Sequence, residues 1–204
     1  MPAMPPGWPW SSPRAGTSAT SGTLRHAVSG SLGQAVHDAV LDGLGDWGLE
    51  RFVHVPSSHV AALIKGLEAR GTPGLLANRE DEAMGIAGGL RLTGARSAVL
   101  MQDNGFGNAL TALTTFVKAY HVGLPVVANT RGGVGEYNAM IHTFSAGVPA
   151  MLAAAGVHME HLGPAHGPEV WRSTVRGACD LAETTHRPVV VLLDLLHPAY
   201  KDGA

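Results

Sequence analysis

Apolar residues follow two different periods along this chain. Leu32, Val36, Val40 and Leu44 recur at every fourth position, which places them on one face of a helix that the segment GDWG at 45–48 ends. Beyond it, short and almost wholly apolar segments alternate with segments of helical period. The helical period predicts further helices over 59–70, 80–92, 109–120, 149–155 and 168–185. The apolar runs predict strands over 51–55, 74–77, 97–101, 124–129, 157–160 and 188–196.

The predicted strands show little polar alternation. Strands of this kind are typical of a parallel sheet whose two faces are both covered by helices. We therefore predict an α/β fold, doubly wound, with a mostly parallel sheet of about six strands and helices on both faces. In such sheets ligands bind beyond the carboxyl ends of the strands, so the loops after the strands are where a site is expected.

The first 22 residues are rich in Pro, Gly, Ser and Thr and have no apolar period. We expect them to form a disordered tail and residues 23–204 to form one domain. The tail lacks a basic start followed by an apolar segment, and no uncharged apolar run reaches the roughly 18 residues that a membrane span needs. The sequence thus predicts a soluble, cytoplasmic protein.

Charge and cysteine content exclude several classes of function. The chain has 14 Lys plus Arg, 16 Asp plus Glu and a formal net charge of −2, with no basic block for nucleic acid or an anionic membrane. The single cysteine, Cys179, lies in a predicted helix and is expected to be buried rather than a nucleophile. His158, His161 and His166 lack the spacing of a helical zinc motif, so no metal ligand is predicted.

Four loops follow predicted strands: residues 56–59, 78–82, 102–108 and 129–136. In the third, QDNGFGN, Gly105 and Gly107 allow a close approach to the backbone, and Asn108 is expected to cap the next helix. Tight packing alone is an alternative explanation of these glycines. The spacing matches neither a phosphate-binding P-loop nor the dinucleotide fingerprint.

The second loop, NREDE, opens a helix with three acidic residues. Glu80, Asp81 and Glu82 are all favoured there by the helix dipole, with Asn78 as a reasonable cap, so they can be explained by helix stability alone. The same helix carries three glycines (Gly85, Gly88 and Gly89), and each costs up to about 1 kcal/mol of helix propensity relative to alanine. A backbone or a ligand packed against the bare face would offset this cost.

Three blocks in this order, REDEAMGIAGGLRLTG, AVLMQDNGFGNALTAL and LPVVANTRGGVGE, resemble the pyrimidine-binding domain of thiamine-diphosphate enzymes. The resemblance covers about residues 30–195 and is closest to the alpha subunits of sulfopyruvate decarboxylases and the matching half of phosphonopyruvate decarboxylases. The family tends to have Asn-Ser in place of Asp103-Asn104, and Leu in place of Phe106. These departures leave the cofactor contact in place and bear on substrate preference.

The resemblance implies a set of site residues. Glu80, rather than its two acidic neighbours, aligns with the catalytic acid that bonds the pyrimidine nitrogen N1′ and helps the cofactor's own amine to take a proton. The cofactor-binding residues would be Glu80, Gln102, Asn104, Gly105, Gly107 and Asn108. The anionic tail of a substrate would be held by Ser57, Ser58, His59 and Arg131, although a structural ion pair is an equal alternative for Arg131.

The resemblance also implies a partner. Family members bind the diphosphate and Mg²⁺ through Gly-Asp-Gly and a later Asn, whereas this chain has only GDW at 45–47. We therefore expect a beta subunit that carries the diphosphate and Mg²⁺, and a hetero-oligomer that decarboxylates a sulfonated or phosphonated pyruvate, 3-sulfopyruvate before 3-phosphonopyruvate. Two alternatives stay open: a non-catalytic binding or regulatory subunit of the same fold, and an unrelated α/β nucleotide-binding module.

Overall fold

The computed structural model describes residues 22–203 of the chain, with side chains described for residues 32–200. Residues 1–21, which hold nearly all of the predicted tail, lie outside the described residues. The first described helix begins at Gly22, one residue before the predicted domain boundary.

Six strands form one sheet, and every pairing in it is parallel. The strands are β1 (Arg51–His54), β2 (Gly74–Leu76), β3 (Ser97–Gln102), β4 (Pro125–Asn129), β5 (His158–Leu162) and β6 (Val189–Leu193). Their order is β2-β1-β3-β4-β6-β5, with registers such as Gln102 opposite Asn129. The predicted sheet of about six mostly parallel strands is thereby confirmed.

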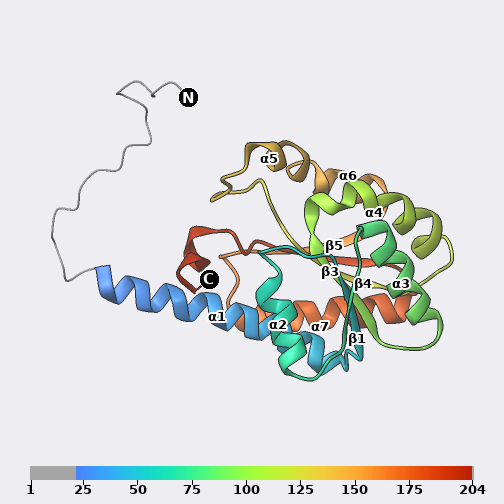
Figure 1. The fold of residues 1–204 in the computed structure, drawn as a ribbon, viewed down its shortest axis with the longest axis horizontal. Helices are drawn as coiled ribbons and strands as arrows, with labels where there is room; N and C mark the ends of the chain where they lie inside the picture. The colour runs from blue at the N-terminus through green and yellow to red at the C-terminus, as the bar shows by residue number, and fades with distance from the viewer. Residues whose placement is uncertain (1–21, 204) are drawn as a thin grey trace, which may run out of the picture.

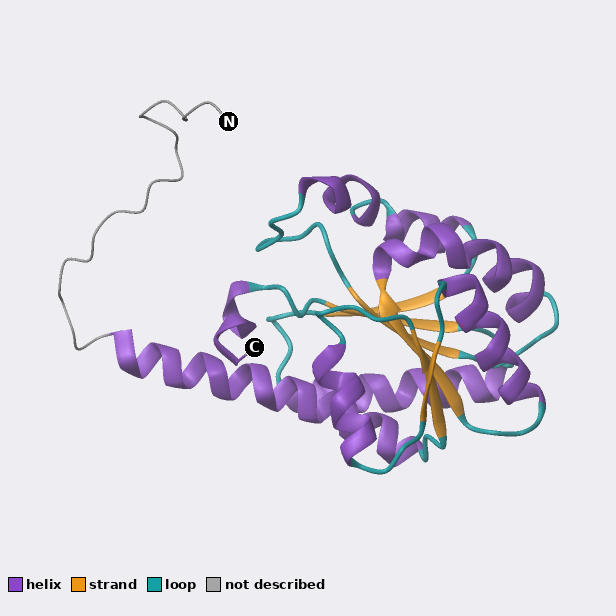
Figure 2. Ribbon diagram, viewed as in Figure 1, coloured by secondary structure: helices purple, strands orange, loops and turns teal. Residues whose placement is uncertain are grey.

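Helices cover both faces of this sheet, as predicted. They are α1 (Gly22–Trp47), α2 (Ala61–Ala69), α3 (Glu80–Leu92), α4 (Phe106–Ala112), α5 (Ala139–Ser145), α6 (Val148–Ala154) and α7 (Pro168–Thr185). Short helical turns occupy Asp103–Gly105, Leu113–Lys118 and Pro198–Gly203. Figure 1 shows α1, α2 and α7 on one side of the sheet and α3, α4 and α6 on the other, and Figure 2 shows the strands enclosed between these two layers.

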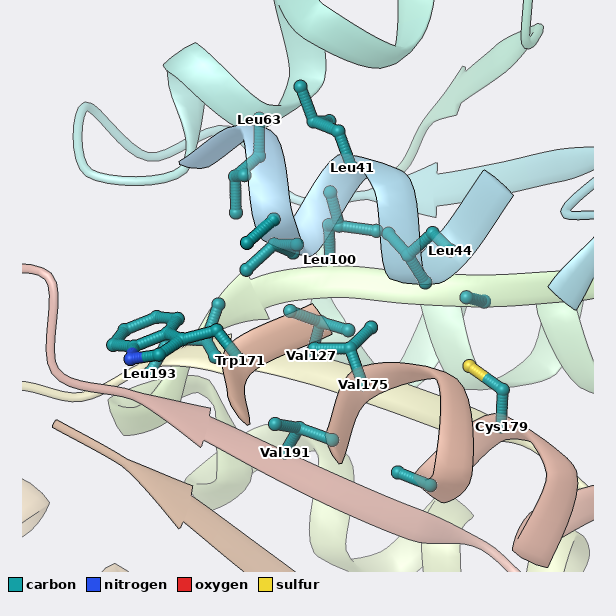
Figure 3. Packing of buried hydrophobic residues seen from close by; sticks show 14 of the residues in the cluster. Leu41, Leu44, Leu63, Leu100, Val127, Trp171, Val175, Cys179, Val191 and Leu193 are labelled. Carbon is teal, nitrogen blue, oxygen red and sulfur yellow. The ribbon is translucent and has the colours of Figure 1, made fainter. Parts of the chain in front are cut away.

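Alternate residues of β1, β3, β4 and β6 supply two separate cores. Leu100, Val127 and Val191 point toward α1 and α7, where they pack with Leu44 and Trp171 (Figure 3). Their neighbours in the strands point to the opposite face and pack under the other helical layer. Because successive side chains of a strand face opposite sides, burial of both faces requires the continuous apolar runs seen in the sequence.

Two differences from the predicted elements concern the helices that follow β3 and β4. The helix expected from residue 109 begins at Phe106, directly after the turn Asp103–Gly105, because the Phe106 side chain is fully buried and fixes this first turn in the core. Helix α5 was not predicted. It begins after Asn138, whose side chain accepts a hydrogen bond from the backbone N–H of Met140 at 3.1 Å, an ordinary helix cap.

Cys179 is buried among the apolar residues of α7, and burial raises the pKa of its thiol to about 12. This confirms the expected structural role. At one edge of the sheet, β2 is short and its apolar side chains are exposed, with 39% of Leu75 and 63% of Leu76 accessible. Within the described residues, no helix is both long enough and apolar enough to cross a membrane.

Candidate active site

Three of the predicted loops meet at the carboxyl ends of β1, β3 and β4. The side chain that joins them is Gln102, the last residue of β3. Its Oε1 accepts hydrogen bonds from Ser57 Oγ at 3.1 Å and from Arg131 NH1 at 2.8 Å, and its Nε2 donates to Asn104 Oδ1 at 2.5 Å. Four of the residues that the sequence singled out are therefore in one hydrogen-bonded group.

Glu80 is the first residue of α3, and its carboxylate points away from its own helix start. Glu80 Oε2 accepts a hydrogen bond from Asn108 Nδ2 at 2.8 Å, across 28 positions of sequence. Asp81 instead bonds Arg79, and Glu82 accepts from the backbone N–H of Asn78 at 2.8 Å. The two neighbours therefore stabilise the helix start locally, whereas Glu80 is held toward a different loop.

Two of the capping residues expected from the sequence are not caps. The residue before α3 is Arg79, so Asn78 stands one position further out and contributes its backbone N–H rather than its side chain. Asn108 lies inside the first turn of α4, which begins three residues earlier than expected because of the buried Phe106. Its amide is consequently free to reach Glu80 instead of capping the helix.

The close approach predicted at the glycine-rich loop comes from within the chain. A Cβ atom on Gly105 would lie 2.6 Å from the Cδ and from Oε1 of Glu80, and one on Gly107 would lie 3.1 Å from the ring of Phe144. Gly105 therefore makes room for the Glu80 carboxylate.

The glycines of α3 divide into two kinds. A Cβ on Gly88 would meet the Phe116 ring at 2.5 Å, so this glycine is explained by packing inside the chain. Around Gly85 and Gly89, apart from their chain neighbours and the backbone of α3 itself, no atom of the described chain lies within 4 Å of such a Cβ. The close packing expected from the sequence therefore occurs within the chain at Gly88, whereas the helix surface at Gly85 and Gly89 is open.

A buried ion pair anchors the loop after β4. Arg131 donates two hydrogen bonds of 2.7 Å to the two oxygens of Glu136, and only 4% and 3% of the two side chains are exposed. The carboxylate also accepts from three backbone N–H groups, at Gly132, Tyr137 and Asn138. The hydrogen bonds from Arg131 hold the pKa of Glu136 well below its usual range, and they raise the pKa of Arg131.

Asp103 joins the loop after β3 to the loop after β4 and to α5. It is 1% exposed, and its carboxylate accepts from Ser145 Oγ at 2.8 Å and from the backbone N–H of Arg131 at 2.9 Å. Burial raises the pKa of this carboxyl group, and the two hydrogen bonds only partly oppose that shift. Asp103 therefore links these segments by hydrogen bonds beneath the site.

Ser58 and His59 lie on the outer side of this network. Their side chains contact each other, with Ser58 Oγ 3.2 Å from His59 Nδ1, and the His59 ring lies 6.3 Å from the ring of Tyr137. All three residues line a groove of about 500 Å³ between α1, α2 and the chain before Tyr200. The substrate residues predicted in this loop are thus beside an open volume.

Residues 34–132 match the family described as thiamine pyrophosphate enzyme, N-terminal TPP binding domain. The matched region contains Glu80 and the whole Gln102 network as far as Arg131. The chain carries the N-terminal domain of thiamine pyrophosphate enzymes. Thiamine pyrophosphate is the cofactor called thiamine diphosphate above.

Similar proteins support this assignment over most of the domain. The chain is 28% identical over 165 residues to the sulfopyruvate decarboxylase subunit alpha of Methanothermobacter thermautotrophicus, covering 78% of this chain and 94% of that protein. It is 26% identical over 169 residues to the subunit of the same name from Methanococcus maripaludis, covering 80% and 95%.

Two solved structures share the fold of this chain. A 2-oxoglutarate:ferredoxin oxidoreductase from Magnetococcus marinus superposes with a TM-score of 0.58 at 22% identity, over 79% of this chain and 29% of that one. A split-gene transketolase superposes with a TM-score of 0.53 at 15% identity, over 78% and 49%. At these identities the likeness establishes the fold alone.

The thiamine pyrophosphate domain has residues that fit the pyrimidine end of the cofactor. In the described chain, Asn108 is the side chain that donates to Glu80, and it uses only one carboxylate oxygen. The other oxygen lies where only a glycine, Gly105, leaves space for it. A half-buried carboxylate with one oxygen engaged fits a ring nitrogen that must be hydrogen-bonded. Among the described residues, no group of three His, Cys, Asp or Glu side chains could hold a metal ion.

Several residues of this domain were missed by sequence reasoning. Glu136 gave no signal beyond its place in a glycine-rich loop, and the partner of Asp103, Ser145, lies in the helix that was not predicted. Asn129, at the end of β4, is fully buried and its amide has no partner within the described chain. Since an unpaired buried polar group costs about 1–3 kcal/mol, this position retains polarity at the expense of stability.

Proposed function

We propose that this chain is the alpha subunit of a two-chain, thiamine-diphosphate-dependent decarboxylase of a sulfonated or phosphonated pyruvate. The observation that carries the proposal is the separation of Glu80 from the other two acids at the start of α3. Asp81 and Glu82 form hydrogen bonds at the start of the helix, and Glu80 alone of the three is held by a residue of the predicted cofactor loop. 3-Sulfopyruvate is the first candidate because the similar proteins are named for it.

Glu80 would hold a proton at the pyrimidine nitrogen N1′. When bound, thiamine diphosphate supplies a carbon nucleophile and an acceptor for the electron pair that carbon dioxide leaves behind. Asn108 orients the Glu80 carboxylate by its 2.8 Å hydrogen bond, and Gly105 leaves room for the orientation to be kept. Half-burial of Glu80 between two elements limits competition from water for the hydrogen bond to the ring.

The tail of the substrate needs hydrogen-bond donors, and the candidate residues differ in the contacts they already make. Ser57 already donates its proton to Gln102, and Arg131 is buried with its donors directed to Glu136 and Gln102. We therefore assign the sulfonate or phosphonate to Ser58 and His59, which line the open groove. In this assignment Ser57 and Arg131 do not contact the substrate, and both hold the Gln102 side chain by hydrogen bonds.

The diphosphate and Mg²⁺ are assigned to a beta subunit. The described residues offer no cluster of metal ligands, and the open surface around Gly85 and Gly89 lies on the helix that begins with Glu80. A partner that approaches this surface would complete the site from the side of α3. The active enzyme is then a hetero-oligomer.

The deciding experiment is decarboxylation by the chain purified together with its partner subunit. We expect carbon dioxide release from 3-sulfopyruvate that requires thiamine diphosphate, Mg²⁺ and both chains. Glu80→Gln should lower kcat by at least about a hundredfold, because it removes the acid at N1′ without changing volume. Asp81→Asn and Glu82→Gln are matched controls, and both should keep near-normal kcat.

Three results would count against the proposal in different ways. Normal activity in Glu80→Gln with an inactive control variant would show that another acid has the role. Cofactor binding by the assembled chains without any carbon dioxide release from 2-oxo acids would favour a non-catalytic subunit. Binding of a nucleotide, and not of thiamine diphosphate, would indicate an unrelated α/β module.

A further inference from the structure

We propose that Glu136, Arg131 and Gln102 form a buried relay of hydrogen bonds that fixes which end of the Asn104 amide faces the candidate site. Asn104 would thereby be kept as a hydrogen-bond donor toward a bound ligand. The identity of that ligand rests on the proposed function, whereas the relay rests on contacts within the chain.

The relay begins with a guanidinium group that cannot rotate. Arg131 uses two of its nitrogens on the two oxygens of Glu136, both at 2.7 Å, and Glu136 is in turn held by backbone N–H groups of the same loop. With 4% and 3% of the side chains exposed, water cannot replace these bonds. The third nitrogen of Arg131 is therefore fixed in direction, toward Gln102.

An arginine side chain has donors and no acceptor, and this sets the direction of every later bond. The atom of Gln102 that faces Arg131 at 2.8 Å must be its oxygen, so its Nε2 must point the other way. That Nε2 donates to Oδ1 of Asn104 at 2.5 Å. With its oxygen turned toward Gln102, Asn104 must direct its own NH₂ group away from the relay.

The outward NH₂ group of Asn104 selects for an acceptor. Asn104 is partly exposed at the head of the glycine-rich loop, one residue before Gly105, which leaves space for the Glu80 carboxylate. A complementary ligand atom carries a lone pair, which describes a carboxylate oxygen of a 2-oxo acid and a ring nitrogen of the cofactor. A ligand group that can only donate would meet a donor there and would be rejected.

Three substitutions separate this polarity from simple packing, and each is made in the chain assembled with its partner. Asn104→Asp keeps the shape and the bond from Gln102 but replaces the outward donor by an acceptor. Asn104→Ala removes both polar ends of the side chain, so it leaves neither a donor nor an opposing acceptor toward the ligand. Gln102→Glu keeps both bonds from Arg131 and Ser57 and removes the donor that orients Asn104.

We expect Asn104→Asp and Gln102→Glu each to weaken binding of one ligand by about tenfold or more. Asn104→Ala should weaken it less than Asn104→Asp, because alanine loses the bond without placing an acceptor opposite the acceptor of the ligand. Titration of thiamine diphosphate by quenching of protein fluorescence and the KM for 3-sulfopyruvate form the two arms. A loss in the first arm assigns the acceptor to the cofactor, and a loss in the second assigns it to the substrate. Full binding by Asn104→Asp in both arms, or weaker binding by Asn104→Ala than by Asn104→Asp, would overturn the relay.

A readout without any ligand keeps the relay testable if the proposed function fails. In the double variant Gln102→Glu with Asn104→Asp, two carboxylates would face each other where the relay has a donor and an acceptor. We expect the decrease in its melting temperature to exceed the sum of the decreases in the two single variants. Additive effects would overturn the relay even in a complex that binds thiamine diphosphate, and failure to bind the cofactor would overturn only the proposed function.

Discussion

Replacing Glu136 by glutamine tests the buried ion pair that supports the site. In Glu136→Gln the Arg131 guanidinium remains buried, 4% exposed, and loses its counter-charge and at least one of its two 2.7 Å hydrogen bonds. Breaking a buried pair in this way costs about 3–5 kcal/mol. At about 2–4 °C per kcal/mol for a domain of this size, the melting temperature should fall by roughly 6–20 °C.

Circular dichroism melts of the purified chain measure this effect, with Asp46→Asn as the control. Asp46 forms an equally short pair with Arg172, at 2.7 Å, but on the surface, where 39% and 43% of the side chains are exposed. Solvent screens such a pair, so this variant should melt at nearly the temperature of the unchanged protein. An equal shift in both variants would refute the argument from burial.

The pH dependence supplies a second test of the same pair. Because Arg131 holds the pKa of Glu136 below the value in the unfolded chain, the pair contributes its full stability above the ordinary glutamate pKa of about 4.3. That contribution is lost as the pH falls below this value. The difference in stability between the unchanged protein and Glu136→Gln should therefore narrow between about pH 4 and pH 2. A difference that is the same at pH 7 and pH 3 would contradict this prediction.

Three further substitutions or reactions test other parts of the structure. Gly105→Ala should keep the fold, because the clashing atoms at 2.6 Å are the flexible end of Glu80, but should abolish most cofactor-dependent turnover. Gly177→Ala in α7, with open space around it, is the active control. Burial raises the pKa of the Asp103 carboxyl group, so its ionisation above about pH 4 disfavours folding. In urea titrations, Asp103→Asn should therefore be more stable than the unchanged protein at pH 7.5 and equal to it at about pH 3. Cys179, with a pKa of about 12, should resist iodoacetamide at pH 8 in the native chain and react in urea, and rapid native labelling would show that α7 opens readily.

The fold was predictable because burial on both faces of the sheet leaves a strong pattern. The helices that begin with Glu80 and with Pro168 end where their apolar period ends, at Leu92 and Thr185. Helix α5 escaped prediction because it is one short, mostly exposed helix, and its only local signal is the capping Asn138.

The site was predictable only as a set of loops. Spacing and resemblance pointed to Glu80, and the structure shows why its two acidic neighbours differ from it, although the catalytic role itself stays a prediction. No pattern in the sequence could indicate that Gly105 serves Glu80 or that Glu136 fixes Arg131, since these contacts depend on which loops the strand order brings together. Tertiary packing determines the direction of side chains at strand ends, and local periodicity cannot predict it.

The short strand β2 has a consequence for handling this chain. As the edge of the sheet, it presents unpaired backbone N–H and C=O groups along one side, flanked by the exposed side chains of Leu75 and Leu76. An uncharged apolar edge of this kind is a template for a strand from another molecule, and its length of three residues is its main protection against self-association. Concentrated stocks are therefore expected to aggregate edge to edge, and a single charge in place of Leu76, which is 63% exposed, would block that route without disturbing either core.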